Sequence, residues 1–175
     1  GRTLIKGDIL GRATGKLLAS PRKVPGSLIP VYSSLVSLRA VPGPQDDFFS
    51  PEGLAAFFGS EFVVSTNANR MGYRLTGPKI MHKGSAPQSI ISEPSLPGGV
   101  QIPPDGQAII LLVEQTVGGY TKIATVISTD IPRVAQAKPG DKIRFEKVSL
   151  EAAYEALMQQ QETVQYLREY LMDRP

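Results

Sequence analysis

NRMGYRLTGPK, residues 69–79, opens the part of the chain that decides the fold. PGGVQIPPDGQAIILL (97–112) and EQTVGGYTKIATVISTDIPR (114–133) continue it. In all three stretches, apolar runs of strand length are interrupted by glycine, proline and polar residues. Two of the stretches place Arg, Lys or Tyr directly beside glycines, where a backbone can approach a ligand closely. This pattern is typical of a site carried on a β scaffold.

The rest of the chain also favours a mainly β fold. Glycine (17) and proline (15) are frequent and spread along the sequence, as in folds with many short strands joined by turns. The run Ile109–Val113 is apolar on both faces and is expected in the middle of a closed barrel or sandwich. The expected strands are Ser33–Ala40, Glu61–Ser65, Tyr73–Thr76, Gly99–Ile102, Ala108–Val113, Ile123–Ser128 and Lys142–Lys147, the last with one solvated face.

Three segments carry helical signals. Ser50 is an expected N-cap before Pro51, and Ile131–Ala137 is expected to form one or two turns. The clearest helix runs from Leu150 to about Met172, with Ser149 as its cap. Its apolar residues fall on one stripe at helical spacing: Ala153, Leu157, Val164, Leu167 and Leu171. We expect this stripe to pack on the chain's own barrel; the alternative is an interface with a partner helix.

The organisation expected from these elements has two parts. Residues 1–148 form a barrel domain, and residues 149–175 form a helix packed on it. The stretch 1–34 is rich in Gly, Pro, Arg and Lys and is expected to be irregular. We expect it to continue an N-terminal half that lies outside this sequence, so that the chain is the C-terminal part of a longer polypeptide.

The composition excludes several function classes. The formal charge of +3 is dispersed, whereas a nucleic-acid face needs clustered Lys and Arg. With no cysteine and one histidine, disulfides and thiolate catalysis are excluded and no metal site is expected. No apolar run reaches the length of a bilayer span, and the first residues lack the apolar region of a signal peptide. We therefore expect a cytoplasmic protein without membrane contact.

The first group of candidate site residues flanks Gly72. Arg70, Tyr73 and Arg74 either decorate a solvated surface strand or form a clamp for a carboxylate or carbonyl group. The guanidinium group is a planar fork of donors that suits such a clamp. The neighbouring Asn69 and a following Gly-Pro turn favour the binding interpretation.

A second group follows the buried strand. It consists of Gln115, Thr116, Gly118, Gly119, Tyr120 and Lys122. A Gly-Gly pair is also what a simple hairpin turn uses, but a hairpin does not require Gln, Tyr and Lys around its tip. Lys122 could hold an anionic intermediate, and Tyr120 could donate a hydrogen bond or relay a proton.

Other polar residues have a structural alternative. Asp130 could act as a base or orient the lysine, but it is slightly more suited to capping the following turn. Gln101 interrupts an apolar strand, so if buried it needs either a ligand or a backbone group as partner. Asp46 and Asp47 could pair as acid and base, although such residues more often cap turns. His82 is expected to be a structural hydrogen bonder, since no triad surrounds it.

Several segments, in this order, resemble the biotin-dependent carboxyltransferase family. They are PGPQDDFF (42–49), NRMGYRLTGPKI (69–80), SEPSLPGGVQIPPDGQAIILL (92–112), QTVGGYTKIATVISTDIPRVAQAKPGD (115–141) and VSLEAA (148–153). The family includes allophanate hydrolase subunit 2, the carboxyltransferase domain of urea carboxylase, the C subunit of bacterial 5-oxoprolinase and the antagonist of a sporulation-kinase inhibitor. Its members are longer, and the resemblance covers their C-terminal half. Val117 and Thr121 stand where the family usually has Thr and Pro, so a hydroxyl donor beside the glycines is missing.

The resemblance implies a mainly β fold, a cyclophilin-like β-barrel with a long C-terminal α-helix. In the 5-oxoprolinase group, three kinds of subunit use ATP to open 5-oxoproline to glutamate. Lys122, Arg70 or Arg74 could then stabilise a developing oxyanion. In the urea carboxylase group a carboxyl group passes from carboxybiotin to urea. Lys122 and Tyr120 would then polarise the ureido carbonyl while a base such as Asp130 takes a proton.

The chain has no biotin-attachment sequence of the Met-Lys-Met type. GRATGK (11–16) is not a phosphate-binding loop, because it has one residue too few between the glycines and Leu17 follows the lysine. We therefore expect no cofactor to be bound by this chain alone, with ATP or carboxybiotin supplied in a complex. The expected partners are a sister protein of the same family, resembling the B subunit of a 5-oxoprolinase, and a larger protein resembling its A subunit.

The expected function is that of one subunit of a 5-oxoprolinase, which acts on a small lactam or amide. One alternative is a carboxyltransferase domain that moves a carboxyl group from carboxybiotin to urea or a related amide. The other is a non-catalytic regulatory binder of a kinase-inhibitor-like partner.

Overall fold

The structure is a computed structural model that describes residues 2–11, 22–114 and 117–172. Its strands are β1 (Leu35–Pro42), β2 (Glu61–Asn69), β3 (Gly72–Thr76), β4 (Ser89–Pro94), β5 (Gly99–Ile102), β6 (Ile109–Leu111), β7 (Val117–Val126) and β8 (Lys142–Lys147). Its helices are α1 (Pro51–Gly59), α2 (Ile131–Gln136) and α3 (Leu150–Met172), with short 3-10 turns η1 (Gly26–Leu28), η2 (Asp46–Phe48) and η3 (Ser128–Asp130).

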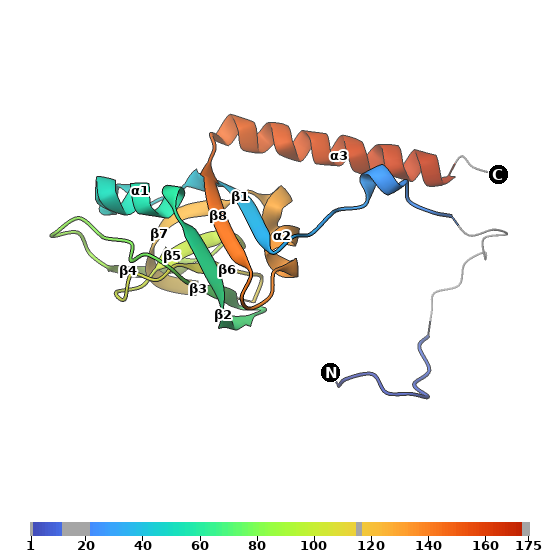
Figure 1. The fold of residues 1–175 in the computed structure, drawn as a ribbon, viewed down its shortest axis with the longest axis horizontal. Coiled ribbons are helices and arrows are strands. Elements are labelled where there is room, and N and C mark those ends of the chain that lie inside the picture. The colour runs from blue at the N-terminus through green and yellow to red at the C-terminus, as the bar shows by residue number, and fades with distance from the viewer. Residues whose placement is uncertain (1, 12–21, 115–116, 173–175) are drawn as a thin grey trace.

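Seven of the strands close into a barrel in the order β1-β8-β2-β3-β6-β5-β7, because β7 pairs back onto β1. The β1–β8 pair is parallel and the other neighbours are antiparallel. β4 does not take part in closure; it adds to the outer edge of β7. The predicted fold class, a mainly β barrel followed by a long C-terminal helix, is confirmed (Figure 1).

The barrel interior is filled by alternate residues of its strands. In β8, Ile143 and Phe145 are buried while their neighbours are exposed, which confirms the predicted alternation. α1 adds Phe57, whose ring stacks on Phe145 with the centroids 4.3 Å apart. Ser50 caps this helix as expected, because its Oγ accepts a hydrogen bond from the Gly53 N–H at 3.0 Å.

Two elements differ from the sequence-based expectation. β4 was not predicted, and β7 begins at Val117 rather than at Ile123, so the Gly118-Gly119 pair lies inside a strand and not at a hairpin tip. Glycine weakens a strand and is typical of turns, but it is tolerated where another segment approaches closely. β6 is shorter than the predicted run, and Val113 beyond it is 71% exposed.

α3 begins over the barrel and then extends past it (Figure 1). The expected cap is present, since Ser149 Oγ accepts a hydrogen bond from the Ala152 N–H at 3.2 Å. The main contacts of α3 with the barrel are to η3 and β1. None of its residues from Leu150 to Met172 is buried. Over the described ranges, no helix combines the length and apolar character that crossing a bilayer requires.

Candidate functional site

Four strands of the barrel bring one row of side chains into register. Arg74 in β3 pairs with Ile109 in β6, Ile109 pairs with Gln101 in β5, and Gln101 pairs with Lys122 in β7. Cross-strand partners share a face of the sheet. Their neighbours in these strands point into the core, as the fully buried Val100 and Ile110 do. The row therefore lies on the outer face of the barrel.

Lys122 and Gln101 are buried although they lie on this outer face. Their residue exposures are 5% and 4%. β4 pairs with the first part of β7 and contributes the acid that meets the lysine, Glu93. The site is therefore built where β4 is added to the closed barrel.

Lys122 is held by two residues from distant segments. Its Nζ donates to Glu93 Oε1 at 2.7 Å, and Gln45 Nε2 donates to the same oxygen at 3.2 Å. Gln45 also fixes the strand itself, because its Oε1 accepts from the Lys122 N–H at 3.0 Å. The hydrogen bond from Lys122 lowers the pKa of the Glu93 carboxyl most, and the hydrogen bond from Gln45 lowers it further. Glu93 is thus a carboxylate at neutral pH that holds an ammonium group in place.

Two buried polar atoms next to Gly118, four residues along β7 from Lys122, have no hydrogen-bond partner in the described part of the chain, Gln101 Nε2 and Ser95 Oγ. Both surround Gly118: a Cβ placed there would lie 2.2 Å from Gln101 Nε2 and 3.3 Å from Ser95 Oγ. Buried polar atoms are nearly always paired, so these two are suited to a polar ligand. A carboxamide and a hydroxyl are donors and acceptors of the kind that recognise an amide.

Glycine is required where the loop before η2 meets β7. A Cβ on Gly43 would lie 2.3 Å from the carbonyl oxygen of Lys122, so no larger residue fits. The Gly43 N–H donates to the Ile123 carbonyl at 2.9 Å. This close approach brings the PGPQ segment to the lysine and places Gln45 on it. The PGPQ segment therefore contacts β7 at Lys122 and Ile123, while β4 pairs with the first part of β7.

Tyr120 and Gly119 extend the site along β7. Tyr120 is two residues from Lys122, is 39% exposed and pairs with Ser89 of β4. Alternate residues of a strand share a face, so Tyr120 lies on the side of Lys122. A Cβ on Gly119 would lie 3.2 Å from Ser92 Oγ.

The two arginines lie farther away. Arg74 pairs with Asp105 at 2.8 Å on the turn before β6, and Arg70 pairs with Glu114 at 3.2 Å beyond β6. Three strand spacings separate Arg74 from Lys122, roughly 14 Å between backbones. The side chain of Arg70 is 83% exposed. Both arginines thus lie outside the Lys122 cluster, with Arg74 on the same face.

Asp130 and Tyr73 are not brought to the lysine. Asp130 is 1% exposed and binds Arg39, accepting from its backbone N–H at 2.9 Å and from its guanidinium at 2.7 Å. The expected cap is absent, because the Asp130 side chain makes no capping hydrogen bond to α2. Tyr73 pairs with the core residue Ile110, and its hydroxyl donates to the Ala135 carbonyl at 3.5 Å.

His82 has the structural setting expected of it. Its Nε2 lies 2.8 Å from Thr121 Oγ1, and its ring packs on Phe49 with centroids 4.5 Å apart. Burial lowers its pKa. His82 therefore links the segment before β4 to β7 as a neutral ring.

Three residues of the cluster were missed from the sequence: Gln45, Glu93 and Ser95. The available signal was their position in polar, proline-containing segments, PGPQ and SEPS, that precede tight turns. Nothing in the sequence of either segment indicates a contact with Lys122, because such contacts arise only when the strands of the barrel pair. The predicted Gln115 and Thr116 lie outside the described residues.

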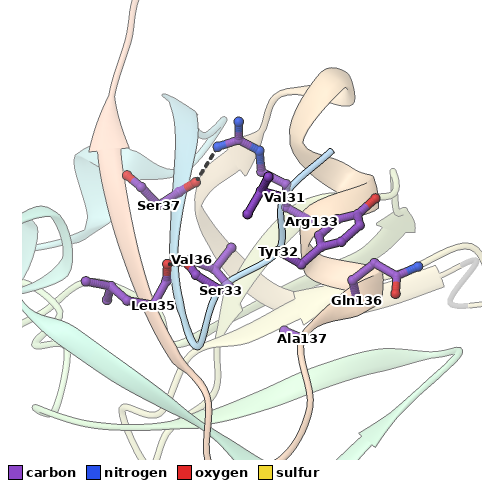
Figure 2. Close-up of a pocket in the computed structure, with 9 residues that line it drawn as sticks. All are labelled: Val31, Tyr32, Ser33, Leu35, Val36, Ser37, Arg133, Gln136 and Ala137. Atoms are coloured by element: carbon purple, nitrogen blue, oxygen red, sulfur yellow. Dashed lines mark hydrogen bonds between the residues drawn. The ribbon is translucent and has the colours of Figure 1, made fainter. Parts of the chain in front are cut away.

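A separate cavity of about 120 Å³ lies between residues 31–37 and α2 (Figure 2). Arg133 lines it and donates to the Ser37 carbonyl at 3.4 Å. None of the residues predicted for the site lines this cavity. Within the described ranges, no group of three or more His, Asp or Glu side chains is arranged to hold a metal ion.

Comparisons with known proteins agree with this architecture. The family model for the carboxyltransferase domain, subdomain A and B, matches residues 1–147. The chain is 41% identical to the C subunit of 5-oxoprolinase from Escherichia coli, over 71% of this chain and 40% of that protein. It is 37% identical to the C subunit of 5-oxoprolinase from Haemophilus influenzae, over 87% of this chain and 48% of that protein.

Among solved structures, the urea carboxylase of Kluyveromyces lactis superposes with a TM-score of 0.76 at 26% identity. The superposition covers 86% of this chain and 14% of that protein. The chain spans less than half the length of the two 5-oxoprolinase C subunits compared above.

Proposed function

This chain belongs to the family of carboxyltransferase domains, subdomains A and B, and on that premise we propose that it is part of a 5-oxoprolinase-type enzyme. In this proposal it works with a sister protein that resembles the B subunit of such an enzyme and with a larger protein that resembles the A subunit. Together they open 5-oxoproline to glutamate with ATP supplied in the complex. The similarity to two proteins named as the C subunit of 5-oxoprolinase supports this choice over other members of the family.

The observation that carries the proposal is that buried Lys122 pairs with the half-exposed Glu93 and lies in register with buried Gln101. Opening a lactam requires its carbonyl oxygen to take negative charge when a nucleophile adds to the carbonyl carbon, before the ring C–N bond breaks. Donors that are fixed in a water-poor site before the reaction stabilise such charge most effectively. Lys122 supplies a cation, and Gln101 supplies an N–H group that has no partner among the described residues.

Each residue of the cluster has a role in this proposal. Lys122 and the Gln101 amide donate to the lactam carbonyl, and Ser95 Oγ binds the ring N–H. Glu93 pairs with the lysine and positions it, while Gln45 contacts both partners of the ion pair. Tyr120 reaches the rim of the site from β7 and could relay a proton to the departing nitrogen.

The arginines serve a different part of the substrate. Arg74 lies on the same face of the sheet as Lys122, and its side chain is 35% exposed. In the assembled enzyme it would attract the substrate carboxylate or a group presented by the sister protein. Arg70, at the hairpin between β2 and β3, is farther from the cluster still.

The test is reconstitution of the protein with its candidate sister subunits, with ATP-dependent formation of glutamate from 5-oxoproline as the readout. Lys122→Ala should lower turnover by about a hundredfold or more while the complex still assembles. The matched control is Lys142→Ala, because Lys142 also pairs with a carboxylate, Glu61, at 3.0 Å, but on β8. Turnover that survives Lys122→Ala contradicts the assignment of the site.

A second candidate function is favoured by the structural similarity to urea carboxylase. Carboxybiotin would then supply an activated carboxyl group, and the donors of Lys122 and Gln101 would fit a ureido carbonyl as they fit a lactam. Carboxybiotin-dependent carboxylation of urea, with no ATP-dependent glutamate formation, would select this alternative. If neither activity appears but the chain binds a kinase-inhibitor-like protein, the result supports the alternative that the chain is a non-catalytic regulatory binder.

A further inference from the structure

Gln45 binds the backbone of β7 with both its main chain and its side chain. Its N–H donates to the Lys122 carbonyl at 3.3 Å, and its side-chain Oε1 accepts from the Lys122 N–H at 3.0 Å. The paired part of β1 ends at Pro42, opposite Ala124. The side-chain carbonyl of Gln45 therefore takes the place that a backbone carbonyl would have if this antiparallel ladder continued.

The surroundings of the Gln45 carboxamide fix its orientation. The oxygen of a carboxamide accepts hydrogen bonds and its nitrogen donates them, so the partners decide which atom is which. Here Oε1 faces a backbone N–H, while Nε2 faces Oε1 of the Glu93 carboxylate at 3.2 Å. The reversed amide would place N–H against N–H and carbonyl against carboxylate. The backbone of β7 thus directs one side-chain N–H of Gln45 at Glu93.

The Glu93 oxygen that accepts this N–H also accepts the ammonium of Lys122, at 2.7 Å. One neutral donor and one charged donor, from distant segments, therefore converge on a single carboxylate oxygen. Hydrogen bonds to an ionised acceptor are stronger than those between neutral groups. Without the N–H of Gln45, Glu93 would be held by the lysine alone, and its side chain is 40% exposed. Gln45 thus restricts where Glu93, and with it the Lys122 ammonium, can lie.

We propose that Gln45 is a positioning residue that acts on Lys122 through Glu93, and that the site requires an uncharged hydrogen-bond donor at this position. The inference rests on the function proposed above, in which Lys122 stabilises charge on the carbonyl oxygen of the substrate. An ammonium group that is held in place before the reaction stabilises that charge best. In this role Gln45 itself binds no substrate atom.

An acid in place of Gln45 separates this role from a purely structural one. In Gln45→Glu the new side chain still accepts from the Lys122 N–H, but when ionised it has no donor for Glu93. Two carboxyl groups this close share one proton, because the second ionises only at a higher pH. While that proton is held, its O–H replaces the native N–H. Once it is lost, the two acids repel each other and the ion pair is disturbed.

The charged groups around Glu93 leave this pair of acids isolated. Lys122 and Tyr120 lie on β7, and Asp46 and Asp47 follow Gln45 in η2. Among the described residues, Lys122 is the one whose charge acts on the Glu93 carboxyl. The shared proton in Gln45→Glu therefore depends on the two acids and the lysine, with no third acid involved.

The first experiment measures the activity of each variant relative to the native protein in the reconstituted complex, over a series of pH values. For Gln45→Glu we expect a ratio within about threefold of unity near pH 5 and a loss of about tenfold or more near pH 8. Gln45→Met, which has neither donor nor acceptor, should lose a similar amount at every pH. Adding Glu93→Gln to Gln45→Glu restores one acid and one amide, so the pH dependence of the ratio should disappear.

The matched control is Gln107→Glu. Gln107 also binds one backbone residue with both atoms of its amide, since it accepts from the Gly77 N–H at 3.0 Å and donates to the Gly77 carbonyl at 3.3 Å. It does so in the turn before β6, so its activity ratio should not vary with pH. A ratio for Gln45→Glu that is independent of pH, or that varies as in Gln107→Glu, overturns the proposal.

The second experiment needs neither substrate nor sister proteins. Carbon-13 NMR of the side-chain carboxyl groups follows their titration in the whole chain. Gln45→Glu should add a carboxyl signal that titrates at a higher pH than any native one, and adding Glu93→Gln should return it to the ordinary range of glutamate. Absence of this signal overturns the inference. If the signal is present but the native complex forms no glutamate, the proposed function is contradicted while the placement of Gln45 against Glu93 is supported.

Discussion

At the scale of single residues, two carboxylate–cation pairs differ in which member is buried, and this indicates different roles for them. Glu93 is on the surface side of its pair, with a side chain 40% exposed, and the lysine is the buried member. In the Arg39–Asp130 pair the acid is the buried member, at 1% exposure. A buried acid tied to a backbone N–H and a guanidinium is typical of a structural anchor, whereas a buried lysine beside unpartnered polar atoms is typical of a binding site.

Asp130 therefore gives a sharp prediction about stability. Asp130→Ala removes the acceptor of the Arg39 N–H and of its guanidinium. We expect it to lower the free energy of unfolding by about 1–3 kcal/mol in urea denaturation, because the Arg39 N–H loses its acceptor.

Glu114→Ala is the matched control for Asp130→Ala. It removes the acid of an exposed pair with Arg70, whose side chain is 83% exposed, and should cost less than about 1 kcal/mol. Similar small losses for both variants, with activity abolished only in Asp130→Ala, would restore the catalytic role that the sequence suggested for Asp130.

At the scale of elements, the site depends on where β4 and β5 meet β7. The Gly118-Gly119 pair allows β7 to pass under the side chains of Gln101, Ser95 and Ser92. In isolation the pair predicts a hairpin, and this is why β7 was expected to begin later. The physical reason is that glycine loses more conformational freedom in a strand than other residues, so its presence there reflects a close approach rather than a strand preference.

The Gly118→Ala variant tests this element directly. Its Cβ would lie 2.2 Å from Gln101 Nε2, the flexible end of a side chain, so the amide should move while the strand remains. We expect a stability change below about 1.5 kcal/mol and a loss of activity of about tenfold or more, mainly in kcat because Gln101 donates to the charge that develops on the carbonyl oxygen.

The control for Gly118→Ala is Gly59→Ala at the end of α1, where an added Cβ meets no atom within 4 Å. It should leave both stability and activity nearly unchanged. Unaltered activity in Gly118→Ala would contradict the placement of Gln101 in the site.

At the scale of the whole molecule, the pH dependence of stability is governed near neutrality by one residue. His82 is the only histidine in the chain, and burial lowers its pKa below the ordinary 6.5. The unfolded chain therefore binds a proton at a higher pH than the folded chain does. Stability from this group is complete above about pH 6.5 and falls as the pH drops from there towards the lowered folded pKa.

We expect the free energy of unfolding of the native chain to fall as the pH is lowered from 7 towards about 5, above the range in which carboxylates titrate. In His82→Gln the slope over this window should vanish, although stability at pH 7 also drops because the contact with Thr121 changes. Denaturation at a series of pH values measures both. An equal slope in the two proteins would contradict the assignment.

The sequence by itself determined the β-rich fold, the caps of α1 and α3 and the alternation of β8, and it marked Lys122 and Gln101 as polar residues within apolar runs. These follow from local patterns, namely turn residues, a period of two or of 3.6, and polar residues inside apolar runs. The apolar stripe of α3 was also readable from the sequence, because the spacing of residues on one side of a helix is a local property.

Only the tertiary structure decided which residues meet. Closure of β7 onto β1 and addition of β4 bring Glu93 and Gln45 to Lys122 and Ser95 to Gly118. Asp130 meets Arg39 instead. The physical reason is that strand order and register are set by how the whole set of apolar faces can be buried together. That collective condition cannot be read from any one segment.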